Sequence, residues 1–413
     1  MTAGRVGQQP GNAGWVEQAL REHEEAERRE SEAARARDHS HGELSGATEA
    51  AGRRPPAGDR EQQVLDRIDR ARRRRPRVRE ERITMAHGAG GKATRTLIEA
   101  IFLDAFRNPM LEPLEDAAAL QAGASRVALT TDSYVVSPLF FPGGDIGDLA
   151  VNGTVNDLSV AGATPLYLSA GFILEEGFPV ADLTQITTSM RAAAAAAGVY
   201  VVTGDTKVVQ KGKADGCYIN TAGVGLIERE TELGVARARP GDAIIVSGPV
   251  GDHGVTIMLA RGELDIEADV ESDTAPLNGL VAGLLDAAPG VRALRDATRG
   301  GVATILNEIA TSAEVGVEVS EDDIPVRDEV RGAAELLGID PMYVACEGRL
   351  VAVVDDADTG RALDALRAHP LGEQAAVIGH VTDDSPGVVR LKTAFGGTRI
   401  VDLLVGDPLP RIC

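Results

Sequence analysis

The stretch that decides the fold reads FFPGGDIGDLAVNGTVNDLSVAGATPLYLSAGFILEEG and spans residues 140–177. Its first half predicts a helix near 145–161, because at 100° per residue several small side chains share one face with Asp157. Its second half, PLYLSAGFIL (165–174), predicts a strand bounded by turn signals. This alternation is typical of α/β and α+β folds.

The alternation of strands and helices continues outward from this stretch. In the first block we expect further strands at 126–132, 199–205 and 217–227, and a helix near 181–197. A second block opens with PGDAIIVSGPVGDHG (240–254) and repeats the pattern to about residue 391. The turn-like RARPGD (237–242) marks the boundary between the two blocks.

These signals predict an α/β (α+β) chain in four parts. The parts are a disordered charged extension, an N-terminal domain, a C-terminal domain and a flexible tail, at 1–82, 83–236, 237–392 and 393–413. The extension is rich in Arg, Glu, Ala and Gly, and Trp15 is its only aromatic residue, so it buries too little apolar surface to order itself. We interpret its run RRRRPRVR (72–79) as a solvated charge run rather than a docking patch.

Charge and cysteine content narrow the class of protein. The net charge is −21, and residues 83–413 carry 24 basic and 47 acidic side chains, which disfavours nucleic acid as a partner. The 3 cysteines form no CxxC pair, so we expect no disulfide framework and favour a reducing cytoplasm. No apolar run predicts a signal peptide or a membrane span.

Four acidic residues are candidates for a Mg²⁺–nucleotide site: Asp116, Asp132, Asp157 and Asp205. Asp132 and Asp205 each follow an apolar strand signal, where α/β folds place their ligands. Asp157 lies on a helix face of small residues, where a carboxylate borders an opening or is costly to bury. Each of the four, taken singly, is also explained as a cap or turn residue.

Two glycine-rich stretches run into predicted helices. They are AHGAGGKATRTLIEA (86–100) and LRDATRGGVATILNEIA (294–310). Backbone N–H groups at such helix starts can hold phosphate, although neither stretch is a Walker loop and plain turns remain an alternative.

The sequence ends in PLPRIC (408–413). Cys413 has chain neighbours on one side only, which suits a thiol that must reach another site. We therefore expect an exposed tail whose cysteine is accessible but not strongly activated.

Several of these stretches, taken in order, resemble one family. They are residues 140–177, VVTGDTKVV (201–209), LRDATRGGVATILNEIA and the terminal LPRIC. Over about 83–413 the chain is similar to the HypE family of hydrogenase maturation proteins, the carbamoyl dehydratases of nickel–iron hydrogenase assembly. The resemblance implies the two-domain fold of the aminoimidazole ribonucleotide synthetase-like superfamily and a homodimer built on the first domain. Asn152, at a position that is usually Cys, and Cys346, at one that is usually Asn, depart from the family pattern.

The resemblance also implies an activity. In this family the carbamoyltransferase HypF loads the terminal cysteine with a carboxamide, and ATP is then used to remove the elements of water. The resulting thiocyanate supplies cyanide to iron, which the HypC–HypD complex carries.

Residue roles carry over by motif match. The catalytic residues implied are Cys413, Lys207 and Glu347. Mg²⁺ and ATP would be bound by Asp116, Asp132, Asp157 and Asp205, with Asn156 and Thr206 completing the nucleotide site.

Two alternatives stay open at this point. An enzyme resembling thiamine monophosphate kinase or selenophosphate synthetase would use the same acids without needing the terminal PRIC. A scaffold that only docks maturation partners would need none of this chemistry.

Overall fold

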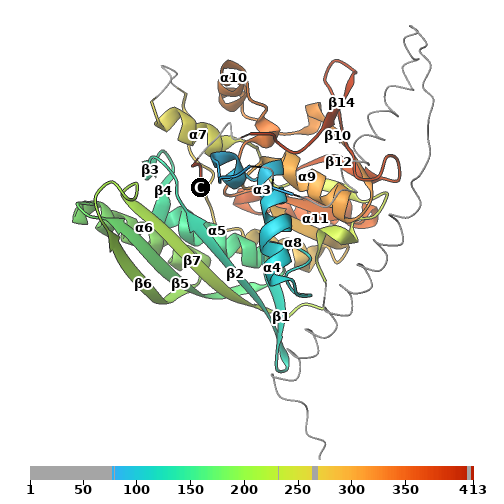
Figure 1. Cartoon of the computed structure of the whole chain (residues 1–413). Helices are drawn as coiled ribbons and strands as arrows, with labels where there is room; N and C mark the ends of the chain where they lie inside the picture. The colour runs from blue at the N-terminus through green and yellow to red at the C-terminus, as the bar shows by residue number, and fades with distance from the viewer. Residues whose placement is uncertain (1–76, 79, 231, 263–267, 407–410) are drawn as a thin grey trace, which may run out of the picture. The chain divides into compact units, whose positions relative to one another are not determined.

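The structure, a computed structural model, describes residues 77–78, 80–230, 232–262, 268–406 and 411–413. These residues all belong to one unit of the chain, 67–413 (Figure 1). The predicted extension, apart from its last few residues, lies outside the described part of the chain. Among the described residues, no helix is both long and apolar enough to span a membrane.

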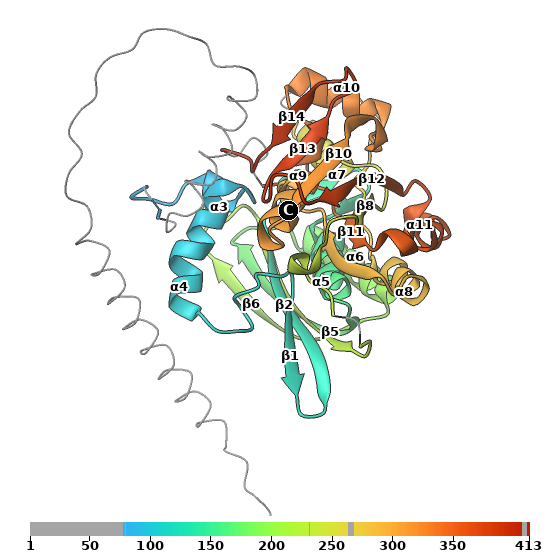
Figure 2. The same ribbon diagram turned by 90° about the vertical axis from the view of Figure 1, so that its right-hand side faces the viewer.

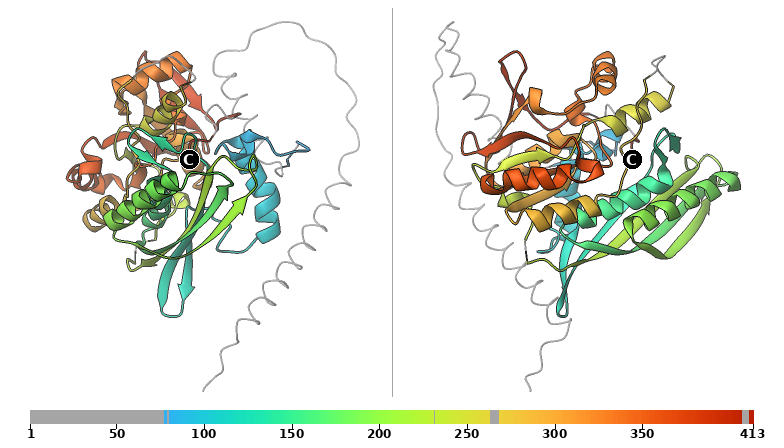
Figure 3. Two further views of the ribbon diagram at one scale, coloured as in Figure 1. Left: turned by 90° about the vertical axis from the view of Figure 1, so that its left-hand side faces the viewer. Right: turned by 180° about the vertical axis from the view of Figure 1, so that it is seen from behind.

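The N-terminal domain is a five-stranded sheet in the order β1-β2-β7-β5-β6. Its strands are β1 Ala118–Ala122, β2 Ser125–Tyr134, β5 Thr164–Glu175, β6 Tyr200–Val209 and β7 Cys217–Ile227. Helices α5 (Ile146–Val160) and α6 (Val180–Ala197) pack on one face of this sheet, as Figure 1 and Figure 3 show. The predicted strands and both predicted helices are confirmed. The strands are longer than expected, so Asp132 and Asp205 lie inside β2 and β6 rather than after them.

Helix α5 is the central element of this domain. The Asp145 side chain caps it by accepting hydrogen bonds from the N–H groups of Gly147 and Asp148. Most of its side chains are buried, because it contacts the N-terminal sheet on one side and β9 and α8 of the C-terminal domain on another. Glycine is required at Gly153, where a Cβ atom would collide with the buried Tyr134 hydroxyl.

The C-terminal domain holds a seven-stranded sheet in the order β14-β13-β10-β12-β8-β11-β9. The strands are β8 Ala243–Val246, β9 Val291–Asp296, β10 Gly316–Ser320, β11 Leu350–Val354, β12 Ala376–Thr382, β13 Val389–Lys392 and β14 Thr398–Val401. Its helices are α7 Asp252–Ala260, α8 Asn278–Ala287, α9 Gly301–Ser312, α10 Asp328–Leu337 and α11 Thr359–Arg367. Central strands β8 and β11 are buried along their whole length, which explains their continuous apolar sequence.

The start of the predicted tail is wrong. Residues 398–401 form β14, which pairs antiparallel with β13 and extends the sheet beyond residue 392. Val401 is buried in the core of the domain, so this segment is held by packing as well as by hydrogen bonds.

The segment before the first sheet follows the glycine-rich prediction. A short 3₁₀ turn, η1 (Met85–Gly88), leads into α3 (Lys92–Leu97), a π-helical turn η2 (Ile98–Phe102) and α4 (Leu103–Phe106). Figure 2 shows this helical segment beside the two sheets. The second glycine-rich stretch likewise joins β9 to α9, as expected.

Gly153→Ala is predicted to destabilise the fold by about 1–3 kcal/mol, because the added methyl group overlaps the buried Tyr134 side chain. Gly283→Ala is the matched control. It makes the same substitution inside α8, where no heavy atom of the described residues would lie within 4 Å of the new Cβ. That variant should gain about 0.5–1 kcal/mol from helix propensity and reduced unfolded-state entropy. Urea unfolding of both variants is the measurement, and equal effects would refute this account of α5 packing.

Candidate active site

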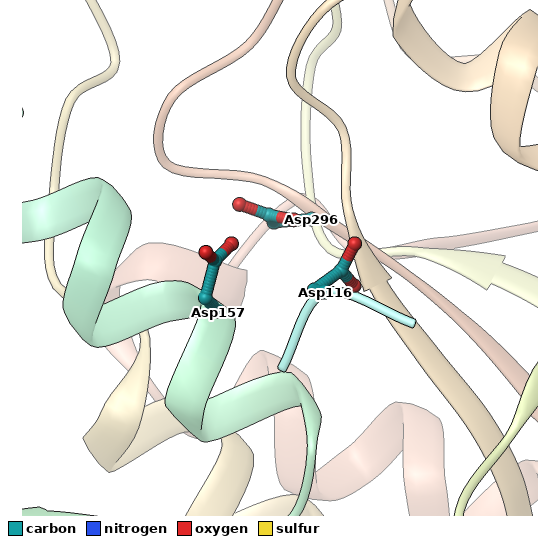
Figure 4. Close-up of side chains that lie close together, drawn as sticks. All are labelled: Asp116, Asp157 and Asp296. Carbon is teal, nitrogen blue, oxygen red and sulfur yellow. The ribbon is translucent and has the colours of Figure 1, made fainter. Parts of the chain in front are cut away.

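Three carboxylates meet where the two sheets approach each other (Figure 4). Asp116 lies in the bend before β1, Asp157 is near the end of α5, and Asp296 is the last residue of β9. One carboxylate oxygen from each lies within 4.8 Å of those of the other two. The Asp157 Oδ2 atom accepts a hydrogen bond of 2.7 Å from the Thr130 hydroxyl, and Arg295 donates to Asp116.

The acid cluster (Asp116, Asp157 and Asp296) has more negative charge than the neighbouring arginine compensates for. Burial raises the pKa of Asp157 well above its ordinary value, and repulsion from Asp296 and Asp116 raises it further. Burial also raises the pKa of Asp296 well above its usual range, with Asp116 adding to the shift and Arg295 opposing it. The Asp296 Oδ2 atom has no hydrogen-bond partner among the described residues. A hard divalent cation fits this donor set, because oxygen ligands are what Mg²⁺ takes and a dication relieves the repulsion.

Asp296 is the member that sequence reasoning missed. Its signal was present, since it ends an apolar strand and precedes the glycine-rich turn of LRDATRGG. The same criterion had selected Asp132 and Asp205 instead.

The terminal cysteine is buried against Arg299, which follows Asp296 by three residues. Cys413 is only 7% exposed, and it packs with Ile412 into the core of the N-terminal domain. Its Sγ atom lies 2.9 Å from Arg299 Nε. The expectation of an exposed tail end is therefore wrong for Ile412 and Cys413, because apolar packing and the guanidinium hold them inside.

The buried thiol is not activated, as the sequence led us to expect. Burial raises the pKa of Cys413 to about 12; Arg299 opposes the shift, whereas Glu347 and Asp132 add to it. At neutral pH the side chain is therefore a thiol.

Glu347 and Asp132 connect the cysteine to the acid cluster. Glu347 is 3% exposed, and its Oε1 atom has no hydrogen-bond partner among the described residues. Burial raises its pKa well above the ordinary value, and the charges of Asp296 and Asp132 raise it further. The same two residues, Glu347 and Asp132, act on the Cys413 thiol, so the thiol and the acids form one electrostatic site.

Strand β6, which carries Asp205, Thr206 and Lys207, is the edge strand opposite β1, and Asp205 is not a member of the acid cluster. Lys207 Nζ is 2.6 Å from Asp205 Oδ2, and their side chains are 68% and 69% exposed. Asp205 pairs across the sheet with Gly171, which pairs with the exposed Asn220. The strand pleat therefore places Asp205 and Lys207 on the face of the sheet away from α5.

Asn156 has a structural position in this chain. Its Nδ2 donates to the carbonyl oxygens of Ala275 and Glu347, and its Oδ1 accepts from the Leu277 N–H. It thus ties α5 to two segments of the C-terminal domain, one of which carries Glu347. Its predicted contact with nucleotide stays a prediction, as does that of Thr206.

Each of the two departures from the family pattern makes a hydrogen bond, while the buried Oδ1 atom of Asn152 has no partner among the described residues. Asn152 Nδ2 donates to the Thr274 hydroxyl at 3.1 Å. The Cys346 sulfur accepts from the Gly251 N–H at 3.2 Å.

The glycine-rich stretches pack directly against each other. A Cβ atom on Gly90, whose φ is +75°, would lie 2.6 Å from Arg299 Cβ. One on Gly300, with φ +80°, would meet Thr304 and, at 3.3 Å, the Gly90 carbonyl oxygen. Glycine is therefore needed for close backbone approach and for left-handed backbone conformation. The predicted phosphate contact of these loops stays a prediction.

Fold and acid cluster together define the class. Residues 114–227 match the N-terminal domain of the AIR synthase related proteins, and residues 239–392 match the C-terminal domain. The chain is 55% identical to the carbamoyl dehydratase HypE of Rhodobacter capsulatus over 339 residues, which are 81% of this chain and 99% of that protein. It belongs to the HypE family of carbamoyl dehydratases, and it is an enzyme of that family.

Two solved structures of relatives agree with this assignment. The crystal structure of a HypE–HypF complex matches with a TM-score of 0.71 and 47% identity, covering 75% of this chain and 99% of that one. A HypE structure in complex with ATP matches with a TM-score of 0.68 and 48% identity, covering 80% of this chain and all of that one.

The acid cluster predicts stabilisation by a divalent cation. Millimolar Mg²⁺ should raise the unfolding temperature of the wild type by a few degrees, corresponding to about 1–3 kcal/mol, and EDTA should reverse the shift. Asp157→Asn and Asp296→Asn should each abolish most of the shift, because each removes one ligand. Asp286→Asn, which removes a surface partner of Arg229, is the control and should keep it. A full Mg²⁺ shift in Asp296→Asn would remove that residue from the site.

Proposed function

We propose that this enzyme uses ATP to dehydrate a carboxamide carried on the sulfur of Cys413, leaving a thiocyanate. Its cyanide would become a ligand of iron in a nickel–iron hydrogenase. The observation that carries the proposal is the burial of the Cys413 thiol against Arg299, three residues after Asp296 of the acid cluster, where the charge of Glu347 also acts on it. Membership of the carbamoyl dehydratase family supports it and disfavours both a kinase-like activity and a scaffold without chemistry.

The substrate ATP would bind at the acid cluster. Asp116, Asp157 and Asp296 would hold Mg²⁺, and Asp132, whose charge acts on Asp296, stays a predicted further ligand. When bound, the cation would offset the charge of the phosphate groups and of the acids. The ATP complex of a relative at 48% identity supports nucleotide binding on this fold.

The chemistry explains why the site needs both phosphate transfer and a base. A carboxamide oxygen is a poor leaving group, but transfer of the ATP γ-phosphoryl group to it creates phosphate as the leaving group. Phosphoryl transfer with loss of one N–H proton gives S–C(OPO₃²⁻)=NH, and loss of phosphate and of the second N–H proton then leaves S–C≡N. ATP becomes ADP and phosphate, so the elements of one water are removed.

Glu347 is the proton acceptor that we assign within this chain. Because burial raises its pKa, its carboxylate is a stronger base than an exposed glutamate. Its unpartnered Oε1 atom is free to accept a proton from the carboxamide nitrogen.

We further propose a homodimer built on the first domain. The sheet face opposite α5 and the neighbouring edge strand β6 expose apolar side chains: Leu129, Tyr167, Ile173, Tyr200, Val202 and Val208. A second copy of this chain would cover them and the unpaired edge of β6. We assign the predicted roles of Lys207, Asp205 and Thr206 to that assembly, because β6 is the edge strand opposite β1 and Asp205 is not among the acids that converge.

A carbamoyltransferase of the HypF type is the proposed donor, and a HypC–HypD complex the proposed acceptor of cyanide. The HypE–HypF complex formed by a relative at 47% identity supports the first assignment. We place the reaction in the cytoplasm.

Intact-mass spectrometry tests the reaction. Wild type incubated with the carbamoyltransferase should gain one carbamoyl group at Cys413 and then lose one water when Mg–ATP is added. Cys413→Ser should accept no usable group, and Glu347→Gln should be loaded but dehydrate more slowly by about 10²-fold or more. Loading at Cys217 or Cys346, or no loss of water, contradicts the proposal.

Val208→Glu tests the dimer. The exposed Val208 side chain lies on β6, and a carboxylate there should repel its counterpart or remain unpaired in a dimer interface. We expect a dimer for the wild type and a monomer for this variant in sedimentation velocity. Val405→Glu, at another exposed apolar position, is the control and should stay dimeric. A wild-type monomer would reject the proposed assembly.

A further inference from the structure

The last three residues are held through their main chain. The Arg411 carbonyl oxygen accepts from the Ser137 N–H at 3.1 Å and from Arg261 Nη2 at 3.0 Å. The Ile412 oxygen lies 2.9 Å from His253 Nε2, and the Cys413 oxygen accepts from Arg299 Nη2 at 2.8 Å. Each of the three oxygens therefore has at least one donor from the body of the protein.

His253 is fixed in the form that this contact needs. A carbonyl oxygen can only accept, so Nε2 carries the proton that it donates to Ile412. The other ring nitrogen, Nδ1, is 2.7 Å from the Ser272 hydroxyl, and the ring packs edge-on against Phe141. The imidazole is fully buried, so its orientation is set by these contacts.

Arg299 donates a side-chain hydrogen bond to the cysteine sulfur. Its Nε donates to Sγ, its Nη2 to the Cys413 oxygen, and its Nη1 to the Gly88 carbonyl oxygen at 2.8 Å. All three nitrogens of the guanidinium are thus engaged, two by the cysteine and one by the first glycine-rich loop. A lysine could not make this planar, forked set of contacts.

The backbone conformation of Arg411 turns the last two residues toward the interior of the protein. Its φ of +58° lies in the left-handed region, which costs a residue with a Cβ atom free energy unless its surroundings compensate. Its oxygen has two donors, and its guanidinium lies 2.8 Å from Asp215 Oδ2. These contacts offset the strained turn that directs residues 412–413 inward.

The geometry points to a latch, formed by Arg299, His253, Arg261 and the Ser137 N–H, that recognises the main chain of residues 411–413 and positions Cys413 in the active site. Arg299 is its central positioning residue, because it alone holds both the sulfur and the last main-chain oxygen. The inference deepens the proposed function, which gives the seated cysteine its purpose. The contacts themselves require neither ATP nor a carbamoyl group.

Site-resolved thiol labelling tests the latch. The folded full-length protein is treated briefly with iodoacetamide, then denatured and cut with endoproteinase Asp-N, which releases Cys413 in a peptide that starts at Asp407. Wild-type Cys413 should label slowly. Arg299→Ala should speed its labelling about tenfold or more, the size expected on losing a charge-assisted hydrogen bond, whereas Arg299→Lys should lie between the two.

Cys217 and Cys346 report on folding in the same sample, because both are buried and their described side-chain hydrogen bonds go to residues outside the latch. They should label no faster in Arg299→Ala than in the wild type. Arg237→Ala, which removes an arginine paired with Glu232 at the surface, should leave all three rates unchanged.

Arg261→Gln supplies a second, independent variant, which loses the donor to the Arg411 oxygen. If Arg299→Ala unfolds, all three of its cysteines will label faster. Arg261→Gln is then the deciding variant, and it should label faster at Cys413 but not at Cys217 or Cys346. Wild-type labelling rates for Cys413 in whichever of the two variants stays folded would overturn the latch. Because the assay uses no ATP and no carbamoyl donor, that result would leave the dehydratase proposal standing, and a failed dehydration assay would leave the latch standing.

Discussion

Crowding of carboxylates away from water, at the junction of two sheets, is the constraint on which the rest of the structure depends. One carboxylate oxygen each from Asp116, Asp157 and Asp296 lies within 4.8 Å of the other two, and the charge of Asp296 raises the pKa of Glu347. Burial penalises every ionised form, and mutual repulsion adds to the penalty. Such a group persists in a folded protein when protons, arginines or a cation compensate for it, and Arg295 supplies part of that compensation. The remainder suits a site whose positive charge arrives with its substrate.

Helix α5 transmits this constraint to the whole unit. Asp157 near its end belongs to the acid cluster, while Asn152 and Asn156 bind the segment 274–277 of the C-terminal domain. Because Asn156 also donates to the Glu347 carbonyl oxygen, the residue that we assign as base is positioned by the same helix that carries Asp157, an acid of the proposed nucleotide site. Burial of α5 between the two domains therefore fixes both halves of the site at once.

The terminal cysteine is positioned rather than activated. Its burial outweighs the neighbouring guanidinium, so the seated side chain is a thiol and not a nucleophilic thiolate. This suits a residue that receives an activated group from another protein and needs only correct placement in its own site. Recognition through main-chain oxygens achieves that placement, since it depends on the path of the last three residues more than on their side chains.

The sequence by itself determined the local elements, the family and two of the three acids that converge, Asp116 and Asp157. Strand and helix periodicity is a local property, so α5, α6, β5 and β7 were predictable, and the ordered motifs identified the family without any coordinates. Which acids converge was not predictable, because that depends on how two sheets meet: Asp296 joined the cluster, whereas Asp205 and Lys207 fell on the opposite face by the parity of the pleat. The tail differed from expectation for the same reason. Position at the end of a sequence suggests exposure, but only tertiary structure supplies the core contacts and the Arg299 guanidinium that bury Cys413.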